Sequence, residues 1–205
     1  MKIAVVGATG MIGSRIVSEA ANRGHHVTAI SRSGKAVPQS NVTAQASDIT
    51  DSTAAKAIAH DHDVVVSAIG PSREANGHPE NFGGTLEQLA LDARATRFVV
   101  VGGAGSLFAA PGLRLADSPE FPEIYKSESL AAAEGLYALQ RRDDLGEWTY
   151  LSPAPVIEPG ARTGRYKVSD DTPAGDYISA EDFAVALVDE IDNPAHTGRR
   201  FTVAN

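Results

Sequence analysis

The sequence predicts an α/β fold, a doubly wound parallel sheet of the Rossmann type, in three layers and one domain over residues 1–205. Apolar runs with strand character alternate with segments of helical periodicity along the chain, which is the order of a parallel sheet covered by helices. The first apolar run leads into a glycine-rich turn and a helix. No internal repeat, low-complexity tract or linker divides the 205 residues, and this length suits one domain.

The composition limits the classes of partner and site. A net charge of −8 argues against a surface for nucleic-acid phosphates or anionic membranes. Without cysteine the chain can form neither a disulfide nor a thiol nucleophile. Met1 and Lys2 enter a strand directly, with no signal-peptide pattern and no apolar run of about 20 residues. We therefore expect a cytoplasmic protein that binds neither nucleic acid nor membrane, as a monomer or homodimer.

The first strand and the turn after it predict a dinucleotide site. Residues 3–6 are apolar, as in a strand buried on both faces, and Gly7, Gly10 and Gly13 follow with the spacing G-x-x-G-x-x-G. In this pattern the first glycine permits a tight turn. The second lets backbone approach a pyrophosphate, and the third lets the new helix pack closely on its strand.

A helix and a second strand follow that turn. Apolar residues recur with helical spacing from Met11 onward, and Gly24 is placed as a helix stop. The amides at the helix start would bind the phosphates. A glycine turn without a ligand is the competing interpretation, but the strand at residues 27–30 completes the order that a dinucleotide fold requires.

The end of the second strand indicates which dinucleotide binds. An NAD site would place an acidic residue there to accept from the ribose 2′-hydroxyl, whereas this strand ends in Ser31-Arg32-Ser33. The Arg32 guanidinium can pair with a 2′-phosphate and stack on adenine. The competing interpretation is a solvated arginine. The sequence favours NADP(H) over NAD(H).

Residues 42–46 predict a third strand, and residues 52–61 an alanine-rich helix. Asp48 would lie at the carboxyl edge of the sheet, where it can accept from the adenine amino group. A helix N-cap role is the alternative for Asp48, although Asp51 or Ser52 suits that role better.

His60 and His62 flank Asp61 near the end of this helix. Histidines at such a position are more often solvated, or interact favourably with the helix dipole, than bound to a metal. We expect no metal site.

Residues 63–70 predict a fourth strand that closes on small residues, which leave room for a ribose. Residues 71–79 form a polar loop that can fold over the cofactor, and a helix is expected at 81–95. A fifth strand at 97–101 exits through Gly-Gly-Ala-Gly-Ser-Leu at 102–107. This exit offers backbone amides and space.

Residues 108–122 contain three prolines and predict an irregular excursion that suits a wall of the substrate pocket. A long helix is expected at 124–142 and a sixth strand at 148–152. Residues 153–155, Pro-Ala-Pro, then lie at the same sheet edge as the glycine turn.

The last part of the chain predicts a second loop-rich excursion at 156–173. Ser179 and Asp182 then fit a capping box that opens an amphipathic helix to about Ile191. A final strand is expected at 201–203.

With these segments placed, the chain resembles an atypical short-chain dehydrogenase/reductase. The relevant group is the NAD(P)H-binding one that includes proteins described as NADH-flavin reductases and biliverdin reductase B. The segments GATGMIG, GGAGSL, WTYLSP and PGARTG carry the resemblance, which covers nearly the full length. It implies an NADP(H) site at the carboxyl edge of the sheet, lined by Gly7, Thr9, Gly10, Met11, Ile12, Arg32, Asp48, Ile49, Ala68, Ile69, Gly70, Gly103, Ala104, Pro153, Ala154, Pro155 and Val156.

The chain departs from the larger superfamily in its proton-handling residues. Typical members use Tyr-x-x-x-Lys with a serine, because the lysine lowers the pKa of the tyrosine. Four positions beyond Tyr125, Tyr137, Tyr150, Tyr166 and Tyr177 stand Ser129, Arg141, Ala154, Asp170 and Glu181. Arg141 stays charged and cannot shuttle a proton, so we interpret Tyr137 as a packing residue. Ala104 stands where the serine is expected.

An enzyme without a positioned acid can reduce an acceptor that takes hydride directly. We therefore expect NADPH-dependent reduction of a small aromatic acceptor, a flavin or quinone, with the flavin as substrate rather than prosthetic group. Ser106 and Tyr125 are candidates for polar contacts to that ring, although loop and helix roles explain them equally well. The alternative is a redox sensor that binds NADP(H) without turnover and acts through a protein partner. A sugar-nucleotide epimerase is disfavoured by the missing Tyr/Lys pair and the short chain.

Overall fold

The computed structural model describes residues 1–35, 37–71 and 81–205. Its main sheet is formed by β1 (Lys2–Val6), β2 (His26–Ser31), β3 (Val42–Ala46), β4 (Val64–Ser67), β5 (Arg97–Val101), β8 (Trp148–Ser152), β10 (Lys167–Ser169) and β12 (Arg199–Ala204). The strand order is β10-β12-β8-β5-β4-β1-β2-β3, and every pair is parallel except β10 with β12. The doubly wound fold is therefore confirmed, with one antiparallel edge strand added.

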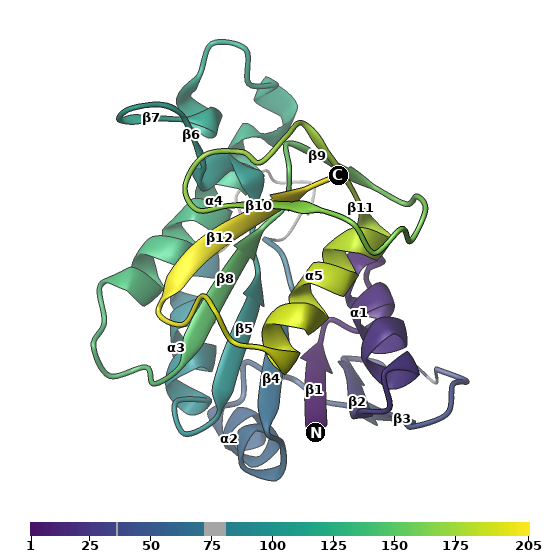
Figure 1. Ribbon diagram of the computed structural model, residues 1–205. Coiled ribbons are helices and arrows are strands. Elements are labelled where there is room, and N and C mark those ends of the chain that lie inside the picture. The colour runs from purple at the N-terminus through teal and green to yellow at the C-terminus, as the bar shows by residue number, and fades with distance from the viewer. Residues whose placement is uncertain (36, 72–80) are drawn as a thin grey trace.

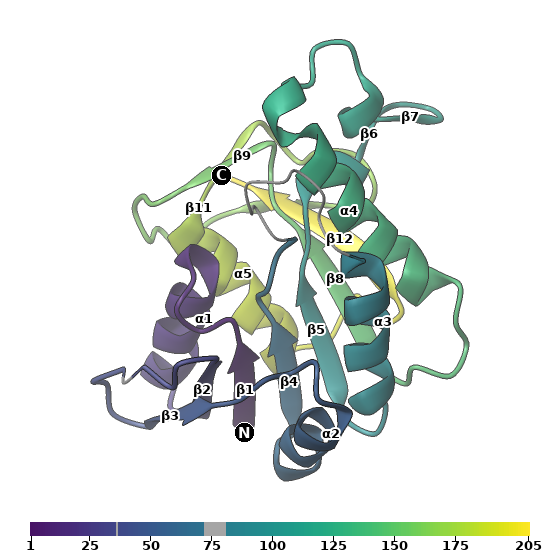
Figure 2. The ribbon, with the colours of Figure 1, turned by 180° about the vertical axis from the view of Figure 1, so that it is seen from behind.

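Five helices of the described residues cover the two faces of this sheet. They are α1 (Met11–Asn22), α2 (Ser52–Asp61), α3 (Phe82–Asp92), α4 (Glu123–Gln140) and α5 (Ala180–Asp192). Helices α1 and α5 lie together over one face in Figure 1, and α2, α3 and α4 cover the other face in Figure 2. Each side has its own buried apolar cluster, so the molecule has three layers. No helix in the described ranges is both long and apolar enough to span a bilayer.

The carboxyl ends of the central strands lie level with one another. Val6 is in register with Ile30 on one side and with Ser67 on the other, and Ser67 is in register with Val100. The segments that leave these strands therefore meet at one edge, the upper edge in Figure 1. In a doubly wound sheet this is the edge at which ligands bind.

Several predicted elements have the predicted bounds. The strands at 42–46, 97–101 and 148–152 and the helix at 52–61 agree residue for residue with the structure. Asp51 caps that helix, since its side chain accepts from the Thr53 amide at 2.9 Å. Gly24 has φ +86° immediately after the end of α1, as its role of helix stop requires.

Two predictions of strand length and loop structure are wrong. The fourth strand ends at Ser67 rather than at residue 70, because beyond it the chain turns across the glycine loop. The first irregular excursion contains a short hairpin, β6 (Phe108–Ala110) and β7 (Leu113–Arg114), which turns at Gly112 with φ +76°. The single-turn 3-10 helices η1 (Ala104–Ser106) and η2 (Leu115–Asp117) flank it.

The second excursion is also not wholly loop. It contains two strands, β9 (Val156–Glu158) and β10 of the main sheet. Strand β9 pairs in parallel with β11 (Tyr177–Ser179). Strands of three residues are too short to give a pattern of alternation in the sequence. The predicted loop at 71–79 lies, beyond Pro71, outside the described residues.

Candidate functional site

Two glycines of the turn between β1 and α1 are required by the fold itself. Gly7 has φ +83°, and a Cβ there would lie 2.6 Å from the Ala68 carbonyl oxygen. A Cβ on Gly13 would lie 2.1 Å from the Gly7 carbonyl oxygen. Neither position can hold a side chain while α1 packs this close to β1 and the turn this close to the chain leaving β4.

Gly10 differs from those two. It is the N-cap of α1 in an extended conformation, and a Cβ there would contact only the Gly7 carbonyl oxygen, at 3.3 Å. The packing of the described chain therefore makes only a mild demand for glycine at this position. The missing side chain instead opens the start of α1 to a group outside the protein, which is the space that a pyrophosphate needs.

The amides at the start of α1 lack partners within the helix. The first helical bond runs from the Ser14 amide to the Gly10 carbonyl at 3.0 Å, and no side chain among the described residues caps the amides of residues 11–13. The first turn contains no acidic residue. Thr9, Gly10 and Met11 are exposed, and Ile12 is half-buried. The positive end of the helix dipole is thus open to an anion.

Arg32 and Asp48 follow β2 and β3 at the same edge. Arg32 is exposed, and no residue that the structure describes hydrogen-bonds its guanidinium. Asp48 Oδ1 accepts from the Thr50 hydroxyl at 2.7 Å and from the Thr50 amide at 3.0 Å. These bonds, with the nearby charge of Arg32, lower the pKa of Asp48. Asp48 is therefore an ionised carboxylate in a local turn, and Asp51 rather than Asp48 caps α2.

The residues after β3 and β4 are only partly covered. Ile49 and Ile69 pack against the cluster under α2, α3 and α4, while Ala68 is half-buried. Gly70 is exposed, and a Cβ there would meet no atom of the described part of the chain within 4 Å. Small side chains therefore leave space beside the glycine turn.

The exit of β5 is shaped by packing rather than by free amides. A Cβ on Gly102 would lie 2.0 Å from the Tyr150 ring, and one on Gly105 would lie 2.6 Å from Ser129 Cβ. The Gly103 amide donates to the Tyr150 hydroxyl at 3.3 Å. Of the backbone amides expected at this exit, that of Gly103 is therefore bonded within the protein. Gly103 and Ala104 remain half-buried at the edge, where they supply space.

Tyr150 is fully buried in the middle of this arrangement. Its hydroxyl donates to the Ala132 carbonyl in α4 at 2.9 Å. Burial raises the pKa of Tyr150 to about 12, although the Gly103 amide acts in the opposite direction. A neutral, buried and fully bonded phenol does not exchange protons with a substrate.

The two candidates for contacts to an acceptor lie in different environments. Ser106 is only 1% exposed, and its hydroxyl donates to the Gly103 carbonyl at 3.3 Å and accepts from Arg200 at 3.1 Å. This burial contradicts a role for Ser106 at the acceptor and gives it a structural one. Tyr125 is 54% exposed on the first turn of α4 and remains a candidate.

Tyr137 packs as its sequence context predicts. It is half-buried against the cluster on the α4 side of the sheet, and the Arg114 guanidinium carbon lies 5.9 Å from its ring centroid.

The Pro-Ala-Pro segment after β8 is divided between core and surface. Ala154 is fully buried in the cluster on the α1 and α5 side, and the buried Pro153 accepts from Thr202 through its carbonyl at 3.4 Å. The Ala154 side chain therefore belongs to the core, and the prediction that this residue lines the cofactor site rests on its backbone. Pro155 and Val156 are exposed at the edge.

Two charged residues, Arg200 and Asp182, have roles at this edge that the sequence does not reveal. Arg200 belongs to an Arg-Arg pair in the sequence, yet it is 5% exposed and donates to the Ser106 carbonyl at 2.6 Å. Asp182 fits a capping box, but the Ser179 amide donates to Asn205 instead. Ser179 Oγ does accept from the Asp182 amide at 3.0 Å, so only half of the box forms. The burial of Arg200 could be inferred from the sequence only by extending the last predicted strand to residue 200 and placing that residue on a covered face of the sheet.

The buried Asp182 carboxylate explains the PGARTG segment. It accepts from the Thr163 amide and the Gly164 amide, each at 2.8 Å, from the Thr163 hydroxyl at 2.6 Å and from the Asn205 side chain at 2.7 Å. Burial alone would raise the pKa of Asp182, but these bonds outweigh it and lower the pKa. The segment is thus fastened to the start of α5 for structural reasons.

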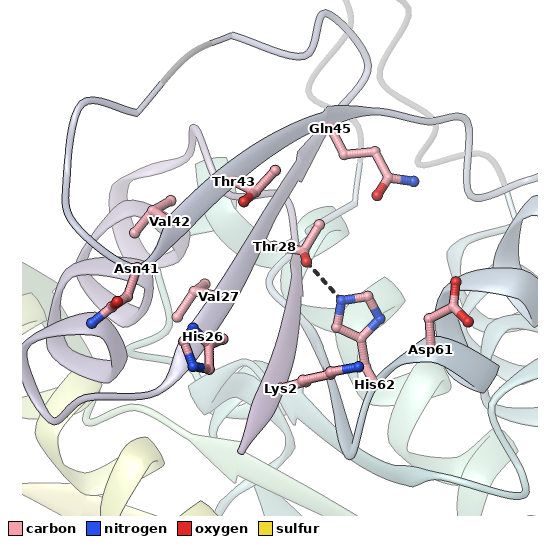
Figure 3. A pocket seen from close by; sticks show the side chains of 10 residues that line it. All are labelled: Lys2, His26, Val27, Thr28, Asn41, Val42, Thr43, Gln45, Asp61 and His62. Carbon is pink, nitrogen blue, oxygen red and sulfur yellow. Dashed lines mark hydrogen bonds between the residues drawn. The ribbon is translucent and has the colours of Figure 1, made fainter.

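An open groove of about 490 Å³ lies at the opposite, amino edge of the sheet (Figure 3). His62 lines it and is bonded twice, by Nε2 to the Thr28 hydroxyl and by Nδ1 to the Ile58 carbonyl, each at 2.7 Å. In the described residues no group of three potential metal ligands occurs. No residue of the glycine turn lines this groove, so the groove is separate from the predicted dinucleotide site.

Comparisons with known proteins agree with this geometry. A family model described as NAD(P)H-binding matches residues 7–194. Protein YwnB of Bacillus subtilis (strain 168), described as uncharacterized, is 40% identical over 213 residues that cover 100% of this chain and 99% of that protein.

Three solved structures are similar over nearly the whole chain. One, from Burkholderia pseudomallei and called a putative exported protein, is 42% identical with a TM-score of 0.88, and 100% of both chains is covered. One from Streptococcus pneumoniae, called a putative NADH-flavin reductase, is 33% identical with a TM-score of 0.89 over 100% of this chain and 99% of that one. A putative epimerase from Bacteroides thetaiotaomicron is 33% identical with a TM-score of 0.84, over 99% and 96%.

Proposed function

Because this chain belongs to the NAD(P)H-binding family, we propose that it is an oxidoreductase that reduces a flavin- or quinone-like acceptor with NADPH. The observation that carries the dinucleotide site is the uncapped start of α1 behind Gly10, at the carboxyl edge of the sheet. Gly7 and Gly13 are needed for packing, whereas the side chain missing at Gly10 serves an outside group. The bound dinucleotide supplies a hydride, and the chain holds its phosphates and positions its ring.

The preference for NADPH rests on Arg32. Its side chain is exposed, follows β2 and has no described hydrogen-bond partner, so it is available to a 2′-phosphate. The acidic residue that would bind a ribose 2′-hydroxyl at this place is absent from Ser31-Arg32-Ser33. Asp48, an ionised carboxylate beside Arg32, can accept from the adenine amino group.

The class of acceptor rests on the residues at the exit of β5. Tyr150 is buried and bonded, Ser106 is buried and bonded, and Ala104 carries no polar group. No tyrosine in the sequence has lysine four positions beyond it. A flavin or quinone ring accepts hydride without a protein acid, because solvent can supply the proton. The name of the Streptococcus pneumoniae relative supports this class, and that of the Bacteroides thetaiotaomicron relative names a different one.

An NADPH oxidation assay tests the proposal. We expect consumption of NADPH with FMN, FAD or simple quinones, and none above background with a matched panel of ketones and sugar nucleotides. Turnover of the second panel alone would contradict the acceptor class. Tight NADPH binding without turnover of either panel would point instead to a sensor acting through a protein partner.

The remaining parts of the proposal concern the state of the protein in the cell. We propose a cytoplasmic monomer or homodimer. Light scattering of the purified protein and cell fractionation test these two statements separately, and the name of the Burkholderia pseudomallei relative makes the second worth testing.

A further inference from the structure

Two polar side chains from neighbouring strands hold the segment that leaves β5. Tyr150 in β8 and Arg200 in β12 are register partners, so they project from the same face of the sheet. The Tyr150 hydroxyl accepts from the Gly103 amide at 3.3 Å. Arg200 Nη1 donates to the Ser106 carbonyl at 2.6 Å and to the Ser106 hydroxyl at 3.1 Å. The two ends of the turn at 103–106 are therefore each fixed by one side chain.

Arg200 joins this turn to a second segment. Its Nη2 forms a short contact with Asp171 Oδ1, and its guanidinium carbon lies 5.6 Å from the centroid of the Phe108 ring. The Phe108 amide in turn donates to the Asp171 carbonyl at 2.8 Å. The turn after β5, the start of the β6–β7 hairpin and the loop before β11 thus converge on one guanidinium.

A buried arginine is a poor way to gain stability alone. Removing a guanidinium from water costs free energy, and a well-packed apolar side chain often stabilises as much or more. Arg200 Nε is also buried and has no hydrogen-bond partner among the residues that the structure describes. What Arg200 supplies, and an apolar residue cannot, is directional bonding to a turn whose own side chains are too small to anchor it.

We propose that Arg200 and Tyr150 are positioning residues that fix the 103–106 turn in the shape that receives the nicotinamide half of the dinucleotide. They do so without touching the cofactor themselves. This inference rests on the proposed function. With the adenine half beside β2 and β3 and the pyrophosphate at the start of α1, the nicotinamide half extends along the sheet edge toward β4 and β5. The adenine half binds elsewhere, at the start of α1 and beside Arg32. A ligand that has only the adenine half should therefore bind the Arg200 and Tyr150 variants as tightly as it binds the wild type.

The test compares NADPH with adenosine 2′,5′-bisphosphate, which lacks the nicotinamide half. Arg200→Met and Tyr150→Phe are expected to weaken NADPH binding by about tenfold, the loss of one or two hydrogen bonds, and to leave the bisphosphate affinity unchanged. Arg200→Lys is expected to recover part of the NADPH affinity, since an ammonium can still reach the Ser106 carbonyl. If the chain prefers NADH, the same comparison uses NADH and ADP.

Arg97→Met is the matched control. Arg97 is also a largely buried arginine, with its side chain 9% exposed, and donates to Glu190 at 3.0 Å at the amino end of β5. We expect it to lower Tm without changing the ratio of the two affinities. Unchanged ratios in the Arg200 and Tyr150 variants, with only Tm lowered, would overturn the inference.

Hydrogen exchange provides a readout that needs no ligand. Amides of residues 102–107 should exchange faster in Arg200→Met than in Arg97→Met. If the wild type binds neither dinucleotide, the proposed function fails by itself, and faster exchange then shows only that Arg200 fixes the turn. Equal exchange in the two variants would refute even that.

Discussion

At the scale of single residues, the glycines of one motif serve different purposes. Gly13→Ala would place a Cβ 2.1 Å from the Gly7 carbonyl oxygen, so we expect a large loss of stability. Gly10→Ala would meet that oxygen at 3.3 Å and nothing else within 4 Å, so the variant should fold with a Tm close to that of the wild type. Its dinucleotide affinity should fall by about tenfold or more, because the added methyl group keeps the pyrophosphate away from the amides at the start of α1.

Thermal unfolding and calorimetric titration of the two variants separate these effects. A Gly10→Ala protein that binds as tightly as the wild type would show that no pyrophosphate approaches the start of α1.

Arg32 carries a separate prediction about the choice of dinucleotide. Arg32→Ala should weaken NADPH binding by about 1 to 3 kcal/mol, the loss of a charge-assisted hydrogen bond, and leave NADH binding nearly unchanged. Titrations with both dinucleotides measure this. Arg141→Ala, which removes an exposed arginine at the far end of α4, controls for the change in net charge. Equal losses for NADPH and NADH would contradict the 2′-phosphate role.

At the scale of elements, the Asp182 carboxylate fastens the 163–164 loop and residue 205 to the start of α5. Because its pKa is lowered in the folded protein, its contribution to stability is complete above the unfolded pKa of about 3.9. That contribution is lost as the pH falls through the folded-state value. Asp182→Asn should therefore lower the free energy of unfolding at pH 7 by about 1 to 3 kcal/mol, and the deficit should shrink below about pH 4.

Urea denaturation at several pH values measures that deficit. Asp143→Asn, at an exposed position with no described hydrogen bond, is the control, and its free energy of unfolding should equal that of the wild type at every pH. A deficit for Asp182→Asn that stays constant down to pH 3 would contradict the role of the charge.

Strands buried on both faces are among the elements that could be predicted from sequence, although the mostly exposed β3 was also placed correctly. In strand β5 the three central residues are buried and residues 98–101 form an unbroken apolar run, so the place of the strand follows from the sequence. Strands β9 and β10 have three residues each, mostly exposed, and proline and glycine around them hide any pattern. The capping box at Ser179 was half right, because the C-terminal Asn205 takes the bond that Asp182 would make.

The residues of the candidate site also fall into those that could be placed from the sequence and those that could not. The glycine turn and Arg32 could be placed because local spacing and strand order fix them. The burial of Ser106, Ala154 and Arg200 could not, because it depends on which strand lies beside which. In the structure Arg200, from a neighbouring strand, donates a hydrogen bond to the Ser106 hydroxyl. The sequence alone left that hydroxyl free to contact an acceptor.

At the scale of the whole molecule, the proposed function combines a fold that holds a dinucleotide with proton transfer from solvent. The pKa of Tyr150 is raised to about 12 by burial, so this phenol stays protonated throughout the neutral range. The rate of hydride transfer to a flavin in single-turnover experiments should therefore be constant from about pH 6 to pH 8. A sigmoidal or bell-shaped dependence in that range would reveal a side chain that handles a proton.

The central claim is that the start of α1 binds a nicotinamide dinucleotide. Isothermal titration of the wild-type protein with NADPH and with NADH tests it most directly. We expect saturable binding at one site per chain, tighter for NADPH, and much weaker binding by Gly10→Ala at an unchanged Tm. Absence of heat with both dinucleotides, or equal affinity in the Gly10→Ala variant, would contradict it.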